Sequence, residues 1–309
     1  MANTRPKNLA ESVRHRLLNL ARARGEENQA VLIRYGVERF LYRLMQTPGG
    51  SRFVLKGALL FTIWDDTPTR PTADADLLGP ALSTPEEMRT FFQTVCTAQV
   101  EDDGLVFDAN TVKTEVIRED QEYGGVRIRA EGRLGNARIP VKVDVGFGDV
   151  ITPAAVEATL PPLLDFPPVQ LRAYPPETAV AEKCHAIVNL GATNTRMKDY
   201  YDLYVLSEVR DFEGALLATA IAATFTRRAT DLPEAAPIGL TAAFSGDPIK
   251  QTQWKAFLRR RGLRPVPTDF SAVVLRVAAF LQPVLDAARS RSDWHARWMP
   301  SRGWIIPGS

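Results

Sequence analysis

Hydrophobic side chains recur every three or four positions near the start of the chain and again over its second half. Near the start, this spacing predicts helices over residues 8–24 and 28–46, the second of which ends at the breaker Pro48-Gly49-Gly50. The same spacing predicts further helices over residues 85–98, 177–190, 195–207, 213–227, 250–261 and 269–290. Both ends of the chain are therefore predicted to be mainly helical.

Strict alternation of apolar and polar residues predicts β-structure between these helical parts. The segments VRIRAEGRL (126–134) and ARIPVKVDVGF (137–147) alternate around a Gly-Asn turn, as the strands of a β-hairpin do. The second segment has its isoleucine and valines on one face, which leaves Lys142 and Asp144 on the other. Residues 151–176 hold seven prolines and are predicted to be a connection without regular structure.

Two shorter segments bring polar groups to the ends of predicted strands. The run FVL (53–55) enters Lys56 and Gly57, and a helix is predicted behind this turn as far as residue 64. The stretch TADADLLG (72–79) predicts another strand. Asp74 and Asp76 point to the same face of that strand, because side chains alternate with a period of two.

Together these elements predict an α+β fold in which a small mixed sheet is flanked by N-terminal and C-terminal helices. We expect the sheet and the N-terminal helices to occupy residues 1–170. A mainly helical part is expected to occupy residues 171–309.

Charge is distributed unevenly along the chain. The 309 residues are 45% hydrophobic and 24% charged, as in ordinary globular proteins, with a net charge of +2. Residues 1–48 carry +5 and residues 250–309 carry +8, so the middle carries −11. An acidic centre suits a bound cation, and basic ends, including the arginine run at 259–261, suit a polyanion such as RNA. Solvated helix surfaces would give the same basic ends.

Nothing in the sequence directs the chain to a membrane or to an oxidising compartment. No apolar run approaches the roughly 18 residues of a membrane span, and the N-terminal residues lack the apolar core of a signal peptide. We therefore expect a cytoplasmic protein. Cys96 and Cys184 are predicted to be free buried thiols, and His15, His185 and His295 lack the spacing of a zinc site.

The Gly57 turn, the pair Asp74 and Asp76, and Asp144 are the parts that metal-assisted nucleotidyl transfer requires. Mg²⁺ prefers hard oxygen ligands, and converging carboxylates repel one another unless a cation compensates them. A glycine N–H can approach phosphate oxygens without a side chain in the way. Taken singly, each signal is more typical of solvated aspartates or an ordinary turn. Their order in one chain favours a nucleotidyltransferase that binds Mg²⁺ through the three aspartates.

A second informative segment is VAEKCHAIVNLGATNTRMKDYYDLYVL (180–206), which predicts two helices around a stop at Gly191. On the first helix Lys183 flanks the apolar stripe, where its ammonium can reach a phosphate. On the second helix Asp199 and Asp202 are i,i+3 neighbours and Lys198 is i,i+4 to Asp202, so that an ion-paired cluster would project from one side. A helix surface with ordinary salt bridges is the competing interpretation.

Seven segments, in order along nearly the whole chain, resemble one known family. They are LLNLARARGEENQAVLIRYGVERFLYRL, RFVLKGALLF, RPTADADLLG, REDQEYGGVRIRAEGRL, ARIPVKVDVGFGD, VAEKCHAIVNLG and TRMKDYYDLYVL. The family is that of the AbiEii/AbiGii-type nucleotidyltransferase toxins, within the polymerase-β-like nucleotidyltransferase superfamily. The resemblance implies the mixed-sheet core of that superfamily and an Mg²⁺-dependent enzyme with a nucleoside triphosphate as donor.

The resemblance also implies a biological role and partners. It implies a toxin of a toxin–antitoxin or phage abortive-infection system that adds a nucleoside monophosphate to RNA, in particular to the 3′ acceptor end of tRNA, and so blocks translation. The expected partners are the nucleoside triphosphate, the RNA and a cognate antitoxin. No membrane partner is expected.

The resemblance assigns roles to residues of the first half of the chain. Gly57, with Lys56 beside it, matches the nucleotide-positioning turn, and Asp74 and Asp76 match the metal-binding pair. Thr72 lies two residues before Asp74, where the family often has Ser or Thr. It is accordingly a candidate nucleotide-site residue and a candidate target for an inactivating modification.

The resemblance assigns further roles in the second half of the chain and leaves others open. Lys183 matches the lysine of an A-E-K motif that is expected to contact the triphosphate, and Asp199 and Asp202 fall in a K-D-x-x-D-L motif. Asp144 fits the third superfamily carboxylate by its strand position. Ala58 departs from the Gly-Gly or Gly-Ser pattern at the turn, which removes a hydroxyl that could bind phosphate.

Two other functions share the same residues. A nucleotidyltransferase that modifies a small molecule would use the same metal chemistry but would have no need of basic ends. A non-catalytic member would bind a nucleotide or an antitoxin, but a costly cluster of charges would then have no reason to be retained.

Overall fold

The computed structural model of the chain falls into two units, which are described separately. The first unit comprises residues 1–148 and 156–173, and the second comprises residues 149–155 and 174–309. The structure describes residues 8–64, 72–80, 83–117, 124–260, 262–291 and 294–306.

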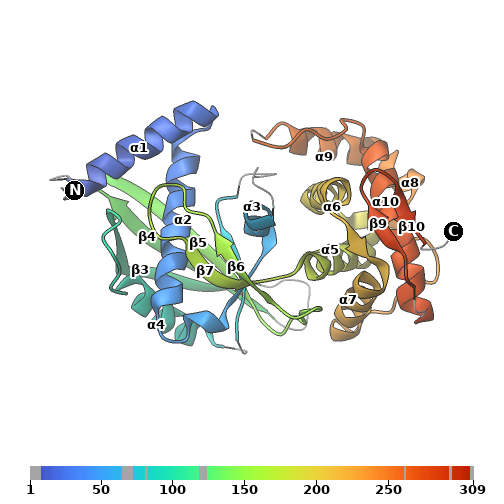
Figure 1. Ribbon diagram of the computed structural model, residues 1–309, viewed down its shortest axis with the longest axis horizontal. Helices are drawn as coiled ribbons and strands as arrows, with labels where there is room; N and C mark the ends of the chain where they lie inside the picture. The colour runs from blue at the N-terminus through green and yellow to red at the C-terminus, as the bar shows by residue number, and fades with distance from the viewer. Residues whose placement is uncertain are drawn as a thin grey trace. The chain divides into compact units, whose positions relative to one another are not determined.

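A sheet of seven strands, in the order β3-β4-β5-β2-β1-β7-β6, runs through the described part of the first unit (Figure 1). The strands are β1 (Val54–Lys56), β2 (Ala75–Leu78), β3 (Leu105–Ile117), β4 (Gly125–Leu134), β5 (Ala137–Gly146), β6 (Val156–Leu160) and β7 (Val169–Ala173). Two neighbouring pairs, β2 with β5 and β1 with β7, are parallel, whereas the others are antiparallel. The predicted mixed sheet is therefore confirmed.

Helices cover one face of this sheet. They are α1 (Leu9–Arg24), α2 (Asn28–Gln46), α3 (Leu60–Trp64) and α4 (Pro85–Cys96), with short 3-10 helices η1 (Gly50–Arg52) and η2 (Gly57–Leu59). The long α2 packs against β5, where Ile139 and Val143 are fully buried. Gly36 allows this close approach, because a Cβ there would lie 2.5 Å from Ile139 Cγ2. Lys142 and Asp144, which alternate with these residues, consequently lie on the opposite face of the sheet.

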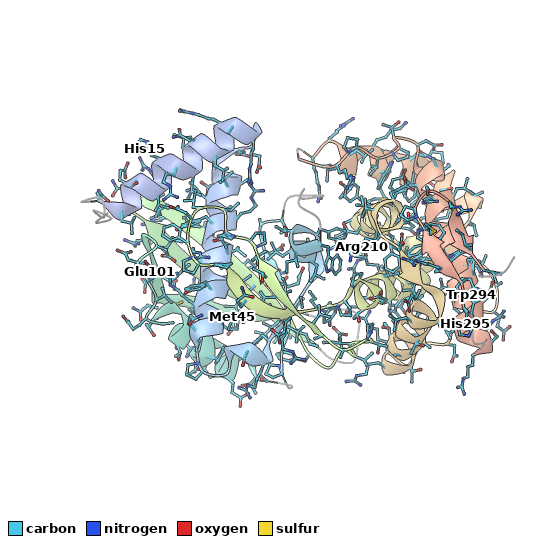
Figure 2. The ribbon with its side chains drawn as sticks, viewed as in Figure 1. His15, Met45, Glu101, Arg210, Trp294 and His295 are labelled. Carbon is cyan, nitrogen blue, oxygen red and sulfur yellow. The ribbon has the colours of Figure 1, made fainter. Side chains whose placement is uncertain are left out.

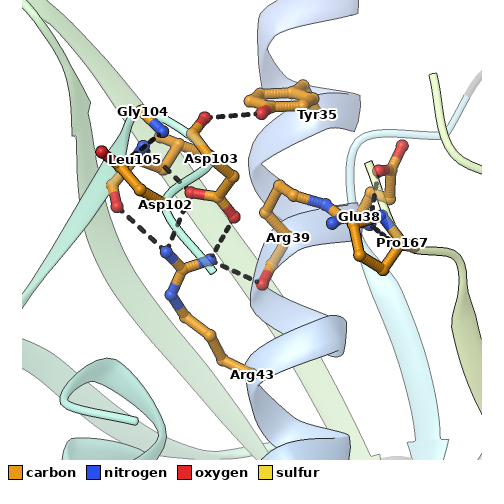
Figure 3. Close-up of polar contacts among 9 residues, drawn as sticks. All are labelled: Tyr35, Glu38, Arg39, Arg43, Asp102, Asp103, Gly104, Leu105 and Pro167. Atoms are coloured by element: carbon orange, nitrogen blue, oxygen red, sulfur yellow. Dashed lines mark hydrogen bonds and ion pairs between the residues drawn. The ribbon is translucent and has the colours of Figure 1, made fainter. Parts of the chain in front are cut away.

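Buried charged groups tie α2 to two loops of the first unit (Figure 3). Arg43 donates hydrogen bonds of 2.7 and 2.9 Å to the two carboxylate oxygens of Asp103, and the Tyr35 hydroxyl donates to the Asp103 carbonyl oxygen. Arg39 donates to the carbonyl oxygen of Pro167 at 2.7 Å. The helix thus positions both the loop that leads into β3 and the loop that leads into β7.

The second unit is mainly helical. Its helices are α5 (Pro176–Leu190), α6 (Met197–Val209), α7 (Gly214–Arg227), α8 (Ala242–Ser245), α9 (Pro248–Leu258) and α10 (Phe270–Ser290), with 3-10 helices η3 (Gly191–Thr193) and η4 (Ile238–Leu240). A small antiparallel sheet, in the order β10-β9-β8, is formed by β8 (Phe212–Glu213), β9 (Arg297–Met299) and β10 (Gly303–Ile305). Trp294 and His295 precede β9, and the Trp294 ring packs on Trp304 at a centroid distance of 4.5 Å (Figure 2).

The central helix of the second unit is α10, which packs against α6 and α7. Among the described residues it is the one helix whose length and composition would suffice to cross a membrane, with a mean hydropathy of 1.5. Its side chains Val273, Val277, Phe280 and Leu281 are fully buried within the unit. The apolar surface of α10 therefore forms the core, as in a globular protein.

Most predicted helices and the β-hairpin are confirmed, whereas three strands of the seven-stranded sheet were missed. The connection expected at 151–176 contains β6 and β7, and no strand was expected where the edge strand β3 lies. Asp74 was expected on a strand but lies one residue before β2 begins. The buried, free state of Cys96 and Cys184 is confirmed.

Candidate active site

Five charged residues form a row across neighbouring strands of the first unit, on the sheet face opposite α2. In the strand register Lys56 pairs with Asp76, Asp76 with Asp144, Asp144 with Arg127, and Arg127 with Glu115. Residues that are directly paired project to the same face, so these side chains lie beside one another. We refer to them as the charged row. Its centre holds two adjacent carboxylates between two cations.

The Asp144 carboxylate is held by Arg127 at one side of this centre. Arg127 Nε and Nη2 each donate to one oxygen of Asp144, both at 2.8 Å. These hydrogen bonds raise the pKa of the Arg127 guanidinium above its ordinary value, and the charges of Glu115 and Asp74 add to the effect. A bidentate pair of this kind fixes the orientation of both side chains.

Asp74 lies next to the row and has a cationic partner of its own. Its Oδ2 is 2.5 Å from Nζ of Lys142, which is two residues before Asp144 on β5, and its Oδ1 accepts a 2.7 Å hydrogen bond from Thr72 Oγ1. The negative charge of Asp74 also raises the pKa of the Arg127 guanidinium. The side chains of Asp74 and Lys142 remain 29% and 36% exposed, so water and solutes can reach this ion pair.

The turn at Gly57 abuts the carboxylate of Asp76. Gly57 has a φ of +74°, a conformation that other residues rarely adopt, and a Cβ at this position would lie 2.0 Å from Asp76 Oδ2. The backbone of the turn therefore meets the carboxylate directly. After the turn the chain continues into η2 and α3.

These residues have the chemistry that a divalent cation such as Mg²⁺ requires. Asp76 and Asp144 are paired on adjacent parallel strands, about 4.8 Å apart, and Asp74 is next to them. All three offer hard oxygen donors, and the Gly57 backbone lies directly against the Asp76 carboxylate. Among the described residues no three acidic, histidine or cysteine side chains converge on one point. Lys142 and Arg127 supply the compensating positive charge.

The second unit contains a different charged cluster, which is buried. Lys183 Nζ on α5 lies 2.6 Å from Asp202 Oδ2 and 3.2 Å from Asp199 Oδ1, both on α6. The side chains of Lys183, Asp199 and Asp202 are 13%, 2% and 0% exposed. We refer to these three residues as the buried triad. Arg196 adds a further contact, with its Nε 2.8 Å from Asp199 Oδ2.

The buried triad corrects the expectation that Asp199 and Asp202 would project from a helix surface. Both carboxylates face α5 and share the Lys183 ammonium, whereas the neighbouring Lys198 is exposed. Removing the ammonium or the carboxylates from such a cluster leaves an uncompensated buried charge. The triad therefore orients Lys183 more firmly than a surface salt bridge would.

The structure places the residues predicted from the sequence in two groups. Lys56, Gly57, Thr72, Asp74, Asp76 and Asp144 lie in the first unit, and Lys183, Asp199 and Asp202 lie in the second. In the first unit these residues are neighbours in pairs, through the strand register, the Thr72–Asp74 hydrogen bond and the contact of Gly57 with Asp76, and in the second unit they form the buried triad.

Arg127 was not predicted as part of the site. The alternation of β4 places its side chain on the polar face of the hairpin, and pairing with Asp144 across the Gly-Asn turn brings the two together. Counting outward from the turn would have found this pair in the sequence.

The basic run after α9 has the exposure expected of an RNA contact or a solvated helix end. Arg259 and Arg260 are exposed, and the Arg260 guanidinium lies 5.1 Å from the ring centroid of Phe257. Arg261 lies outside the described residues. Trp254 and Phe257 are buried and belong to the core of the second unit.

One family of known proteins matches most of the chain. The sequence profile of the family described as nucleotidyl transferase AbiEii toxin, type IV TA system, matches residues 39–276. A comparison with curated protein sequences found no match.

Two solved structures are similar to the chain at low sequence identity. A candidate nucleotidyltransferase from H. pylori is 14% identical, with a TM-score of 0.48, over 86% of this chain and 99% of that chain. The protein JHP933 from Helicobacter pylori is 13% identical, with a TM-score of 0.47, over 86% of this chain and 94% of that chain.

Proposed function

We propose that this chain, which belongs to the AbiEii nucleotidyl transferase toxin family, transfers a nucleoside monophosphate from a nucleoside triphosphate to RNA. The acceptor we propose is the 3′ end of tRNA, where an added nucleotide blocks aminoacylation and so stops translation. The observation that carries the proposal is the charged row, in which Asp76 and Asp144 lie side by side at the Gly57 turn with Asp74 next to them. The basic ends of the chain support a polyanionic substrate.

We assign the metal site to Asp74, Asp76 and Asp144 of the first unit. Bound there, Mg²⁺ would neutralise the triphosphate and activate the attacking hydroxyl. The Gly57 turn, with Lys56 beside it, would bring its backbone N–H groups near the phosphates, because the turn lies directly against the Asp76 carboxylate. Residues 1–170 would thus form the nucleotidyltransferase core.

In the mainly helical region 171–309 we assign the triphosphate-binding role to Lys183. Asp199 and Asp202 fix its ammonium by two contacts at 3.2 and 2.6 Å, so both act as positioning residues. Holding a flexible lysine in one geometry lowers the entropy cost of binding phosphate. The exposed Arg259 and Arg260 would contribute to contacts with the RNA backbone.

As a type IV toxin acting on tRNA, the protein would work in the cytoplasm and be controlled by a cognate antitoxin. Thr72 is the residue at which covalent control would act most directly, because its hydroxyl donates to Asp74 Oδ1 at 2.7 Å. Phosphorylation would remove that hydrogen bond and place negative charge beside a metal-binding carboxylate. The expected result is loss of transfer without loss of fold.

Transfer of label from nucleotide to RNA tests this function. Purified protein is incubated with Mg²⁺, each α-labelled nucleoside triphosphate in turn, and total tRNA. The proposal predicts label on tRNA with the wild type and with Glu115→Gln, an outer carboxylate of the charged row, but not with Asp76→Asn. Label on a small molecule without RNA would move the function to small-molecule modification. No transfer to any acceptor would contradict the enzymatic function.

A further inference from the structure

The first unit contains a second concave site, on the α2 side of the sheet. A cavity of about 260 Å³ lies among the end of α1, one face of α2, the η2 and α3 segment, and the chain that follows β6. It is lined by Arg24, Arg34, Val37, Glu38, Leu59, Thr62 and residues 160–163. Because α2 packs on the face opposite the charged row, this cavity is separate from the carboxylates of the proposed metal site.

The inner wall of the cavity carries a carboxylate with unused hydrogen-bonding capacity. Glu38 is 4% exposed, and its Oε2 accepts a 2.7 Å hydrogen bond from the Leu163 N–H. Its Oε1 lies 2.8 Å from Arg39 Nη2 but has no hydrogen bond, because Arg39 directs that group at Pro167. A buried acceptor left in this state can gain a donor from a ligand.

The rim of the cavity carries two arginines. Arg34 pairs with Glu26 through Nη2, but its buried Nε has no hydrogen-bond partner. Arg24 and Arg34 both line the cavity, and burial lowers the pKa of Arg34, with the charge of Glu26 opposing this shift and the charge of Arg24 adding to it. Glu26 and Glu38 balance the two arginines, so an anion would be attracted by the unpaired buried donor of Arg34 and by the exposed guanidinium of Arg24.

The remaining walls are apolar and the enclosed volume is small. Val37, Leu59, Leu160 and two prolines provide apolar contact surface. A volume of 260 Å³ equals the room of about nine water molecules, which is comparable to a purine ring. The site therefore combines space for a flat ring, an acceptor for a ring N–H and cations for an attached anion.

We propose that this cavity binds a mononucleotide, with its base between the apolar walls, a donor of the base on Glu38, and its phosphate at Arg24 and Arg34. This site is additional to the metal-dependent site on the other face of the sheet. Leu59 and Thr62 continue directly from the Gly57 turn, so a bound nucleotide would contact the element that carries the turn.

Calorimetric titration of the full chain with AMP, GMP, ribose 5-phosphate and inorganic phosphate tests the proposal. The titrations contain EDTA and are repeated with the double variant Asp74→Ala, Asp76→Ala, so that binding at the carboxylates does not contribute. The proposal predicts that AMP and GMP bind equally well to wild type and double variant. Ribose 5-phosphate and phosphate, which lack the base, should bind at least about tenfold more weakly.

Two variants and one matched control locate the binding. Arg24→Glu should weaken AMP binding by about tenfold or more, because a charged hydrogen bond is lost. Thr62→Trp should abolish it by filling the cavity. Arg22→Glu makes the same charge change at an exposed position on α1 that does not line the cavity, and should leave AMP affinity within about twofold.

Several outcomes would overturn the proposal. They are the absence of nucleotide binding in EDTA, equal effects of Arg24→Glu and Arg22→Glu, and wild-type affinity of Thr62→Trp. If circular dichroism shows that Thr62→Trp does not fold, the comparison of Arg24→Glu with Arg22→Glu still tests the proposal. None of these outcomes depends on whether the charged row transfers nucleotides.

Discussion

The two units hold their proposed functional charges in opposite ways. In the first unit, the Asp74–Lys142 pair is about one-third exposed, and the carboxylates of the charged row are partly accessible. In the second unit, the buried triad is almost completely shielded, with Asp202 at 0% exposure. Ion pairs in water are worth little and exchange partners easily, whereas a buried pair is costly to break.

This difference indicates that the two charged clusters have different roles. Lys142 and Arg127 balance carboxylates that a metal ion would also balance, so the first unit can exchange these partners during a reaction cycle. The triad instead fixes Lys183 in one orientation by contacts that water does not reach. We expect variants in the first unit to change binding and activity, and variants of the triad to change stability as well.

The largest expected effect is on stability, from Lys183→Met. Removing the ammonium leaves Asp199 and Asp202 buried without their shared partner, which should cost about 3–5 kcal/mol of unfolding free energy. Lys142→Met is the matched control and should cost less than about 1 kcal/mol, because its pair with Asp74 is partly exposed. Guanidinium unfolding of both variants measures the difference. Equal losses of unfolding free energy would show that the buried triad and the Asp74–Lys142 pair contribute equally to stability.

The next effect is on activity, from Gly57→Ala. The added Cβ would lie 2.0 Å from Asp76 Oδ2, so the carboxylate must move, and a displacement of this kind costs about 100-fold in rate. Gly25→Ala is the control, since Gly25 has a similar φ of +63° but nothing within 4 Å of an added Cβ. Both variants should lose stability from backbone strain, Gly57→Ala more because of its contact with Asp76, and only Gly57→Ala should lose nucleotidyl transfer. Similar activities would show that the close approach has no role.

The stability contributions of Glu38 in the first unit and His185 in the second should depend on pH in opposite directions. Burial raises the pKa of Glu38 to about 7 from 4.5, with Arg39 and the Leu163 N–H opposing the shift, so its contribution to stability is complete below pH 4.5 and is lost as the pH rises through 7. Burial and then the charge of Arg228 lower the pKa of His185 to about 4 from 6.5. Its contribution is present above pH 6.5 and is lost as the pH falls through 4.

Melting temperatures between pH 5 and pH 8 test these two opposite pH dependences of stability. Glu38→Gln should remove a destabilisation of roughly 1–3 kcal/mol that the wild type suffers towards pH 8. His185→Gln should flatten the loss that the wild type suffers towards pH 5. If either variant keeps the wild-type pH profile, the assigned group is not the one that titrates.

The smallest expected effect is on metal affinity, from Lys142→Met. Without its ammonium, Asp74 has one fewer competing cation, so Mn²⁺ used in place of Mg²⁺ should bind about two- to fivefold more tightly. Lys113→Met, an exposed lysine on β3, should leave the affinity unchanged. Weaker binding in Lys142→Met would show that the lysine assists the metal rather than competing with it.

The sequence predicted the elements whose hydrophobic pattern is local. The helices α1, α2 and α10 follow their apolar spacing closely, and the β4–β5 hairpin follows its alternation. The strand β7 was missed although its antiparallel partner β6 is close in sequence, and its other partner, β1, precedes it by more than one hundred residues, where no local pattern reports the pairing. The prolines around β7 also suggested a loop.

The same limit applies to the charged residues. Asp74 and Asp76 could be placed on one face from their spacing alone, whereas the burial of Asp199 and Asp202 depends on Lys183, which comes from another helix. Spacing along α6 gave no sign of that partner. The bidentate pair of Arg127 and Asp144 could have been predicted from the sequence, because the register of a two-residue hairpin fixes it.

Mn²⁺ binding measured by electron paramagnetic resonance tests whether the aspartates of the charged row bind the catalytic metal. Wild type, Asp76→Asn and Glu115→Gln are titrated in parallel. The last removes a carboxylate charge from the outer end of the same row, beside Arg127. We predict equal Mn²⁺ affinity for wild type and Glu115→Gln, and a loss of at least about tenfold for Asp76→Asn. Wild-type affinity in Asp76→Asn, or an equal loss in both variants, would contradict the account.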